Sequence, residues 1–143
     1  MPVVCQQVEL MVRVNQRRAS LPDVLAEVAR WGCNVLAYCS YADREEFVVL
    51  LVADDPAVAK RGLEGRGFTC KANPVVLVRE TDSVGAAANL GFHLSRSGID
   101  ILYSYASSSG SDEFWAVFKT TDDDRAIRDR KSTRLNSSHL VIS

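Results

Sequence analysis

Two short loops in the sequence carry residue types that could bind a small charged ligand. The better of the two, Asp82–Gly85, holds an acid and a glycine immediately before an Ala-rich segment. A glycine lets backbone N–H groups approach a carboxylate, and the N-terminus of a following helix favours that negative charge. An acid beside it can accept hydrogen bonds from an ammonium group. The loop Asp82–Gly85 is therefore where we look first for a functional site.

The segments around these loops repeat at a fixed offset of 66 residues. Apolar and glycine positions coincide at that offset, which pairs Val24 with Leu90, Val28 with Leu94, Gly32 with Gly98 and Val35 with Ile101. Such self-similarity indicates two copies of one supersecondary unit.

The first copy predicts strand, helix, strand, strand, helix and strand in that order. We expect strands at Val3–Val14, Cys33–Tyr41 and Phe47–Val52, a helix between Ser20 and Gly32, a helix from Asp54 or Asp55 to about Arg61–Gly67, and a last strand interrupted at Asn73-Pro74. Ser20 and Gly32 are natural helix caps. The order predicts an α+β fold of tandem ferredoxin-like βαββαβ repeats, with an antiparallel sheet and helices on one face.

The second copy follows in the same order without a linker. Its helix is expected at Ala86–Ser97, with Asp82 as a candidate N-cap, and its middle strands at Ile99–Ala106 and Phe114–Thr120. A further helix should begin at Asp122–Asp124. No closing strand follows that helix, so the second copy is expected to be incomplete.

The last fifteen residues are expected to be non-native. Asp129–His139 reads DRKSTRLNSSH, which resembles the read-through translation of a common sequencing adapter. We therefore divide the chain into a first repeat at 1–73, an incomplete second repeat at 74–128 and a non-native tail at 129–143. Removing the three bases and one acid of the tail leaves 14 Lys and Arg against 17 Asp and Glu, a formal charge of −3. That charge favours neither nucleic acid nor a membrane as a partner.

The composition, 47% apolar over 143 residues, indicates a globular protein with a core. The sequence has no run of about 20 apolar residues and no signal-peptide layout, so we expect a cytoplasmic protein. The cysteines form no CxxC motif and are expected to be buried thiols rather than disulfides or metal ligands; they are Cys5, Cys33, Cys39 and Cys70. His93 has no carboxylate or cysteine partner in the sequence and is expected to be a partly buried helix residue. We therefore predict no catalytic residue, no metal and no cofactor.

The motifs around the two loops resemble those of the ACT domain, a small-ligand sensor module. The family's pattern is a strand ending in Asn/Asp-x-Pro-Gly-x-Leu, a helix, and Gly-(Ile/Val)-Asn-Ile leading into the second strand. Asp82–Ala87 matches at the acid and the glycine but lacks the proline, and Gly98–Ile101 matches with Asp in place of Asn. Gly32–Val35 matches closely, whereas Gln16–Leu21 has lost the acid, the proline and the glycine. The resemblance covers about Val3–Arg128.

This resemblance implies that two units lie side by side in one eight-stranded sheet and that an amino acid binds at the joint between them. The implied ligand residues are Asp82, Gly85 and Ala86 in the second loop, Gln16 and Ala19 in the first loop, and Asn34 and Asp100 at the start of the second strands. Ala19 at the glycine position would impede backbone approach, so the two sites are expected to be unequal. Arg17 and Arg18 could instead hold an anion through their side chains.

The resemblance further implies a non-catalytic regulatory module that acts through a homodimer or a partner enzyme. Three alternatives stay open. A small enzyme on the same scaffold would need a nucleophile and a base, or metal ligands. An RNA-binding module would need exposed aromatic residues on its central strands and a basic surround. A purely structural dimerisation domain would bind no ligand.

Overall fold

The computed structural model describes residues 3–81, 83–108 and 112–128, and it has an α+β fold with an antiparallel sheet. The chain forms two compact units. The first unit is Val8–Asn73, and the second combines the chain up to Gln7 with the chain from Pro74 onward. The tail assigned at 129–143 lies outside the described residues.

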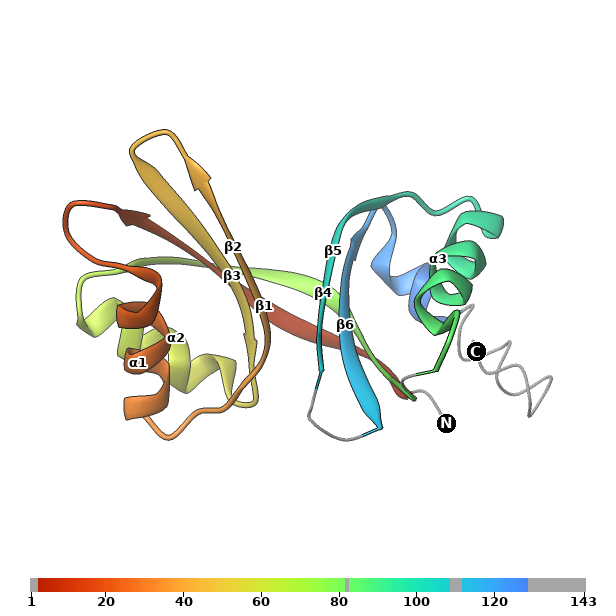
Figure 1. The fold of residues 1–143 in the computed structure, drawn as a ribbon, viewed down its shortest axis with the longest axis horizontal. Coiled ribbons are helices and arrows are strands. Elements are labelled where there is room, and N and C mark those ends of the chain that lie inside the picture. The colour runs from red at the N-terminus through yellow and green to blue at the C-terminus, as the bar shows by residue number, and fades with distance from the viewer. Residues whose placement is uncertain (1–2, 82, 109–111, 129–143) are drawn as a thin grey trace. The chain divides into compact units, whose positions relative to one another are not determined.

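The first unit contains the N-terminal half of the repeat pattern. Its elements are β1 (Val3–Asn15, from Val8), α1 (Leu21–Arg30), β2 (Val35–Asp43), β3 (Glu46–Ala53), α2 (Pro56–Gly65) and the start of β4 (Thr69–Thr81). The strand order is β2-β3-β1-β4, and β3 pairs with both β1 and β2 in antiparallel register. Helices α1 and α2 cover one face of these strands (Figure 1).

The core of the first unit follows from the two sequence periodicities. Alternate residues of β1 point toward the helices, where they meet one stripe of α1 and one of α2. The buried members of this cluster are Leu10, Val12 and Val14 of β1, Val24 and Val28 of α1, Val49, Leu51 and Ala53 of β3, Ala59 and Leu63 of α2, and Cys33. The predicted caps are present: Ser20 is the N-cap of α1, and Asp55 accepts a hydrogen bond from the Val58 amide at 3.2 Å.

The second unit repeats this arrangement. Its elements are the N-terminal part of β1, β4 from Pro74, α3 (Ala86–Arg96), β5 (Ile101–Ser108), β6 (Glu113–Thr120) and a helical stretch at 123–128. The strand order is β1-β4-β6-β5, with β6 antiparallel to both β4 and β5. Leu90 and Leu94 of α3 are buried, as are Val24 and Val28 at the repeat offset in α1. Gly98 and Gly32 both end their helices with positive φ, +73° and +76°.

The beginning of β1 completes the second unit. In the strand order it occupies the position beside β4 that a closing strand would take. Val4 is 3% exposed and belongs to the same core cluster as Val76, Val78, Leu90 and Phe118. The N-terminal residues of the chain therefore take the place of the closing strand that was not expected in the second repeat.

Helix α2 ends at Gly65, inside the predicted range of Arg61–Gly67, and Gly67 adopts a left-handed conformation with φ +89°. Two other features differ from the predictions. Strand β4 runs continuously from Thr69 to Thr81 and is not interrupted at Pro74. The N-cap of α3 is Gly85, not Asp82, which lies outside the described residues.

Candidate functional site

The loop before α3 is shaped by Gly85. Its φ of +85° lies in the left-handed region, which glycine adopts without steric cost. The Ala86 amide donates to the Ser83 carbonyl at 3.1 Å, and the Asn89 amide donates to the Gly85 carbonyl at 3.0 Å. Gly85 thus turns the chain from the end of β4 directly into the first turn of α3.

The N-terminus of α3 differs from the other helix starts, which are each occupied by a carboxylate of the chain. In α1, Asp23 accepts hydrogen bonds from the amide and hydroxyl of Ser20 at 2.7 and 2.8 Å, and these bonds, the amide first, hold the pKa of Asp23 below its usual value. Asp55 caps α2, and Asp122 accepts from the Arg125 amide at 3.1 Å at the start of 123–128.

No such carboxylate is found at α3 among the described residues. Its first turn has no acid, and Gly85 has no side chain to cap it. Within the same described part of the chain, the amides of Ala87 and Ala88 have no hydrogen-bond acceptor. The positive end of the helix dipole is therefore not compensated by a described side chain.

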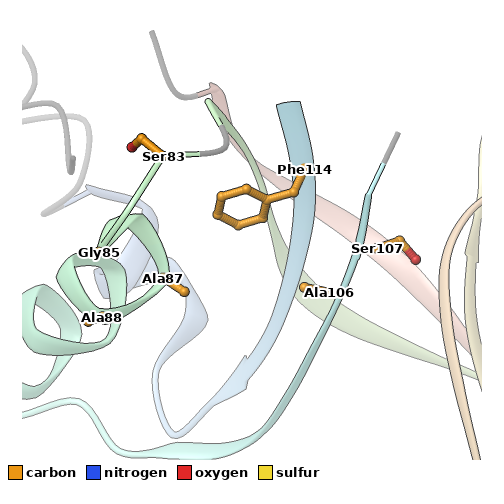
Figure 2. A pocket seen from close by; sticks show the side chains of 7 residues that line it. All are labelled: Ser83, Gly85, Ala87, Ala88, Ala106, Ser107 and Phe114. Carbon is orange, nitrogen blue, oxygen red and sulfur yellow. The ribbon is translucent and has the colours of Figure 1, made fainter. Parts of the chain in front are cut away.

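A pocket of about 300 Å³ opens at this helix start, inside the second unit. Small side chains and one aromatic ring line it: Ser83, Gly85, Ala87, Ala88, Ala106, Ser107 and Phe114. Figure 2 shows the Phe114 ring projecting from β6 toward the first turn of α3, with Ala106 on the neighbouring strand β5. The volume lies at the lower end of the range of about 300–1,000 Å³ that is typical of small-molecule pockets. The arrangement offers backbone donors at one end and an apolar wall at the other.

Of the residues predicted for the second loop, the structure brings Gly85 into this pocket. Ala86 is buried at the start of α3, and Asp82 lies outside the described residues. Asp100 lies at the opposite end of β5 from the pocket, where its amide bonds the Thr121 hydroxyl at 3.2 Å. Six residues of extended strand separate Asp100 from Ala106, which corresponds to about 20 Å.

Of the residues predicted for the first copy, Gln16 and Ala19 belong to the turn that follows β1, whereas Asn34 pairs with Asp54. Asn34 exchanges hydrogen bonds with Asp54: its amide donates to the Asp54 carboxylate at 2.9 Å, and its carbonyl accepts from the Asp54 amide at 3.0 Å. The Gln16 side chain donates to the Glu46 carbonyl at 3.3 Å. Ala19 lines a second, polar pocket beside the start of α1.

The residues that sequence reasoning missed come from distant segments. Phe114, Ala106 and Ser107 form the strand side of the pocket, and they lie more than twenty positions beyond Gly85. A signal was present only for the helix side, because Gly85 and the Ala-rich stretch after it predict a loop that leads into a helix.

Within residues 3–81, 83–108 and 112–128, no group of three or more His, Cys, Asp or Glu side chains could hold a metal ion. Among the described helices, none has the length and apolar character needed to span a bilayer.

Several solved structures are similar to this chain over nearly its whole length. Protein BT0572 from Bacteroides thetaiotaomicron matches with a TM-score of 0.79 and 22% identity, covering 92% of this chain and 90% of that one. The ligand-free regulatory subunit of aspartate kinase from Thermus thermophilus matches with a TM-score of 0.63 and 10% identity, over 90% and 93% of the two chains. The aspartokinase α and β subunits match at 0.60 and 18% identity, over 94% and 97%.

No protein-family model matches the sequence, and no curated protein matches it. The similarity is therefore one of three-dimensional structure at low sequence identity, and it shows the fold. The order of elements, the two repeated units and these matches agree with the motifs around Gly32 and Gly98. The chain has the tandem ACT-domain fold, the fold of regulatory subunits such as that of aspartate kinase.

Proposed function

We propose that the chain is a non-catalytic regulatory module that binds a small amino acid in the pocket at the start of α3. The observation that carries this proposal is the contrast between helix starts. Asp23 places a carboxylate at the N-terminus of α1, whereas in α3 the amides of Ala87 and Ala88 have no described acceptor, and both residues line a pocket. The carboxylate of a bound amino acid would fill that place.

The lining of the pocket supports a binding role. Its side chains offer two serine hydroxyls, but no histidine, cysteine or carboxylate that could act as a general base. The apolar wall of Ala106 and Phe114 suits a short uncharged side chain better than a charged one. Asp82, the first residue of the loop Asp82–Gly85, is our candidate for binding the ligand's ammonium group.

Regulation requires that ligand binding changes an association with a second copy or with a partner enzyme. The shared fold with regulatory subunits supports this part of the proposal. The four cysteines are free thiols, which fits a reducing compartment such as the cytoplasm. Sedimentation of the chain with and without its ligand tests the association. A sedimentation coefficient that does not change when a saturating ligand is added would count against ligand-controlled homodimerisation.

The test of the site is a thermal-shift screen of the twenty amino acids on the full chain, followed by titration calorimetry on each hit. Ala88 occupies the third position of α3, which corresponds to Asp23 in α1. Ala88→Asp should therefore supply the missing carboxylate in cis, stabilise the helix start by about 0.3–1 kcal/mol and abolish the ligand response. Ala88→Asn adds nearly the same bulk without charge and should keep most of the response.

A response that survives Ala88→Asp would place the ligand elsewhere. A flat screen with the unmodified chain would favour the structural dimerisation alternative. Loss of response in both Ala88 variants would show that bulk, rather than charge, blocks the site, and the carboxylate assignment would then be withdrawn.

A further inference from the structure

Glu80, near the end of β4, is a buried acidic residue beside the pocket at the start of α3, and it is only 3% exposed. Val76 and Val78 of the same strand belong to the core cluster that includes α3. Glu80 continues their alternation, so its side chain lies on the same face of the sheet. In the antiparallel register Glu80 pairs with Phe114, whose ring lines the pocket. Such partners lie about 5 Å apart at their Cβ atoms, so Glu80 is close to the pocket without belonging to its lining.

The equivalent position of the first unit holds Val14, 66 residues earlier in the sequence. Val14 is also 3% exposed, and its partner in the antiparallel register is likewise a phenylalanine, Phe47. Val14 lines the polar pocket at the start of α1, so this strand position borders a helix start. A carboxylate is costly to bury, whereas a valine is not. A glutamate at this position therefore indicates a role other than packing.

The two units place their acidic residue differently around the helix start. In the first unit Asp23 lies in the first turn of α1, and the strand position holds Val14. In the second unit the first turn of α3 has no acid, and the strand position holds Glu80. The Thr81 amide donates to Glu80 Oε1 at 3.0 Å, a bond that stabilises a carboxylate anion. The second unit thus has a negative charge near the pocket, but in the strand rather than in the helix.

We propose that Glu80 determines specificity at the α3 pocket, because its charge selects amino acids over carboxylic acids that lack an amine. A carboxylate at the amides of α3 is repelled by the like charge of Glu80 at short range. The ammonium group of an amino acid offsets this repulsion, whereas a plain carboxylic acid has nothing to offset it. Glu80 acts through space, since it is buried outside the lining, and Asp82 stays the candidate for direct contact. This inference rests on the proposed amino-acid site at α3.

The experiment compares L-alanine with propionate, which has the same carbon skeleton without the amine, by titration calorimetry on the full chain. The unmodified chain should bind L-alanine more tightly than propionate. Glu80→Gln keeps the shape of the side chain and removes its charge. It should raise the affinity for propionate relative to that for L-alanine by about fivefold or more, because the repulsion of the anion is lost. Glu80→Met, a second neutral variant without hydrogen-bonding groups, should change this ratio equally if charge alone is responsible.

Glu113 provides the matched control, because it precedes Phe114 in β6 and its side chain lies on the opposite face of the sheet. That side chain is 43% exposed and contacts Arg79 at 3.4 Å. Glu113→Gln should leave the ratio of the two affinities within about twofold, since an exposed charge is screened by solvent and salt.

Three results would overturn the role of Glu80. The first is an equal rise of the ratio in Glu113→Gln and Glu80→Gln, which would indicate a diffuse effect of net charge. The second is an unchanged ratio in Glu80→Gln while L-alanine still binds, which would leave the α3 site itself intact. The third is the absence of binding of both probes to the unmodified chain, in which case the screen of twenty amino acids decides separately whether the α3 site exists.

Discussion

The indole ring of Trp31 lies against the backbone of Gly62 and fills the space that a side chain at position 62 would occupy. A Cβ atom on Gly62 would come within 2.8 Å of the Trp31 Cγ atom. The indole Nε1 donates to the buried carboxylate of Glu27 at 3.2 Å, which fixes the ring in this position. Gly62 is therefore a contact residue of the first unit, although it sits inside a helix where glycine is normally unfavourable.

Replacing Gly62 with alanine should destabilise the chain, although glycine-to-alanine substitutions inside helices usually stabilise a protein. Gly→Ala in a helix normally stabilises by about 0.5–1 kcal/mol. Gly62→Ala should instead destabilise the chain by about 1 kcal/mol, because the added methyl group displaces Trp31 from Glu27. Gly65→Ala in the same helix meets nothing within 4 Å and should be neutral or slightly stabilising. Urea titrations measure both, and a gain in stability for Gly62→Ala would contradict the packing described here.

Among the acidic residues of the first unit, substitution of Glu27 should lower the free energy of unfolding the most. Its side chain is 7% exposed and faces Trp31, Arg30 and Arg66. Glu27→Ala leaves these donors without their shared acceptor and should lower the free energy of unfolding by about 1–3 kcal/mol. Glu64→Ala removes an exposed pair with Lys60 and should change it by less than about 1 kcal/mol. Equal effects in a denaturant titration would mean that the Glu27 cluster adds nothing beyond surface charge.

The N-terminal strand should stabilise the second unit selectively. Val4→Ala removes two methyl groups from that core and should cost about 2 kcal/mol. Val3, its neighbour, is 39% exposed, and Val3→Ala should stay within about 0.5 kcal/mol. Hydrogen exchange followed by mass spectrometry locates the effect: Val4→Ala should speed exchange in β5 and β6 more than in β2 and β3. Faster exchange confined to β2 and β3 would contradict the assignment.

Cys70 should make the stability depend on pH in the alkaline range. Burial, followed by the nearby charge of Glu64, raises the pKa of Cys70 from 9.0 to about 11. Between these values the unfolded chain loses the thiol proton while the folded chain keeps it, so the free energy of unfolding should fall as pH rises from 9 to 11. Cys70→Ala should flatten this slope, and iodoacetamide should label native Cys70 slowly at pH 9. Labelling as fast as in the unfolded chain would disprove the shift.

Valine substitutions at Gly85 and Gly98 distinguish the effect of backbone strain from the loss of ligand binding. Gly85 and Gly98 both have positive φ, +85° and +73°, and no atom lies within 4 Å of a Cβ at either position. Valine should therefore cost at least about 1–2 kcal/mol at each, because the left-handed region is unfavourable for a side chain. Only Gly85→Val should also abolish the response to an amino acid, since Gly98 does not line the pocket. A thermal-shift titration in which both variants respond equally would argue against the α3 pocket.

The sequence predicted those parts of the fold that depend on local signals. Ser20 and Asp55 are the N-cap residues of their helices as expected, because each acts on a residue three positions away: Ser20 donates to the Asp23 carboxylate, and Asp55 accepts from the Val58 amide. Gly32 and Gly98 end α1 and α3 for an equally local reason, the need for positive φ. The apolar β3 lies between two strands, as its two-sided hydrophobicity indicated.

What the sequence could not reveal depends on pairing between distant residues. The run of β-branched residues in β1 predicts a strand, but it does not show that Val4 and Leu10 enter different cores. Only half of the α3 pocket was predictable for the same reason: Gly85 has a local signature, whereas Phe114 reaches the pocket through the pairing of β6 with β4 and β5. The second, polar pocket beside the start of α1 likewise brings together side chains from three separate segments, among them Arg13, Arg18 and Arg66.

The split of β1 between two cores has a consequence for how the chain folds during synthesis. Val8–Asn73 is contiguous, so it can fold as soon as it has left the ribosome. Residues up to Gln7 are made before this unit, whereas their partners in β4, α3 and β6 are made after it. The N-terminal part of β1 therefore has no partner strand until β4, α3 and β6 have been synthesised. The entropy cost of closing this long loop then opposes the folding of the second unit. An N-terminal fusion that restrains this segment should slow that step while leaving the first unit free to form.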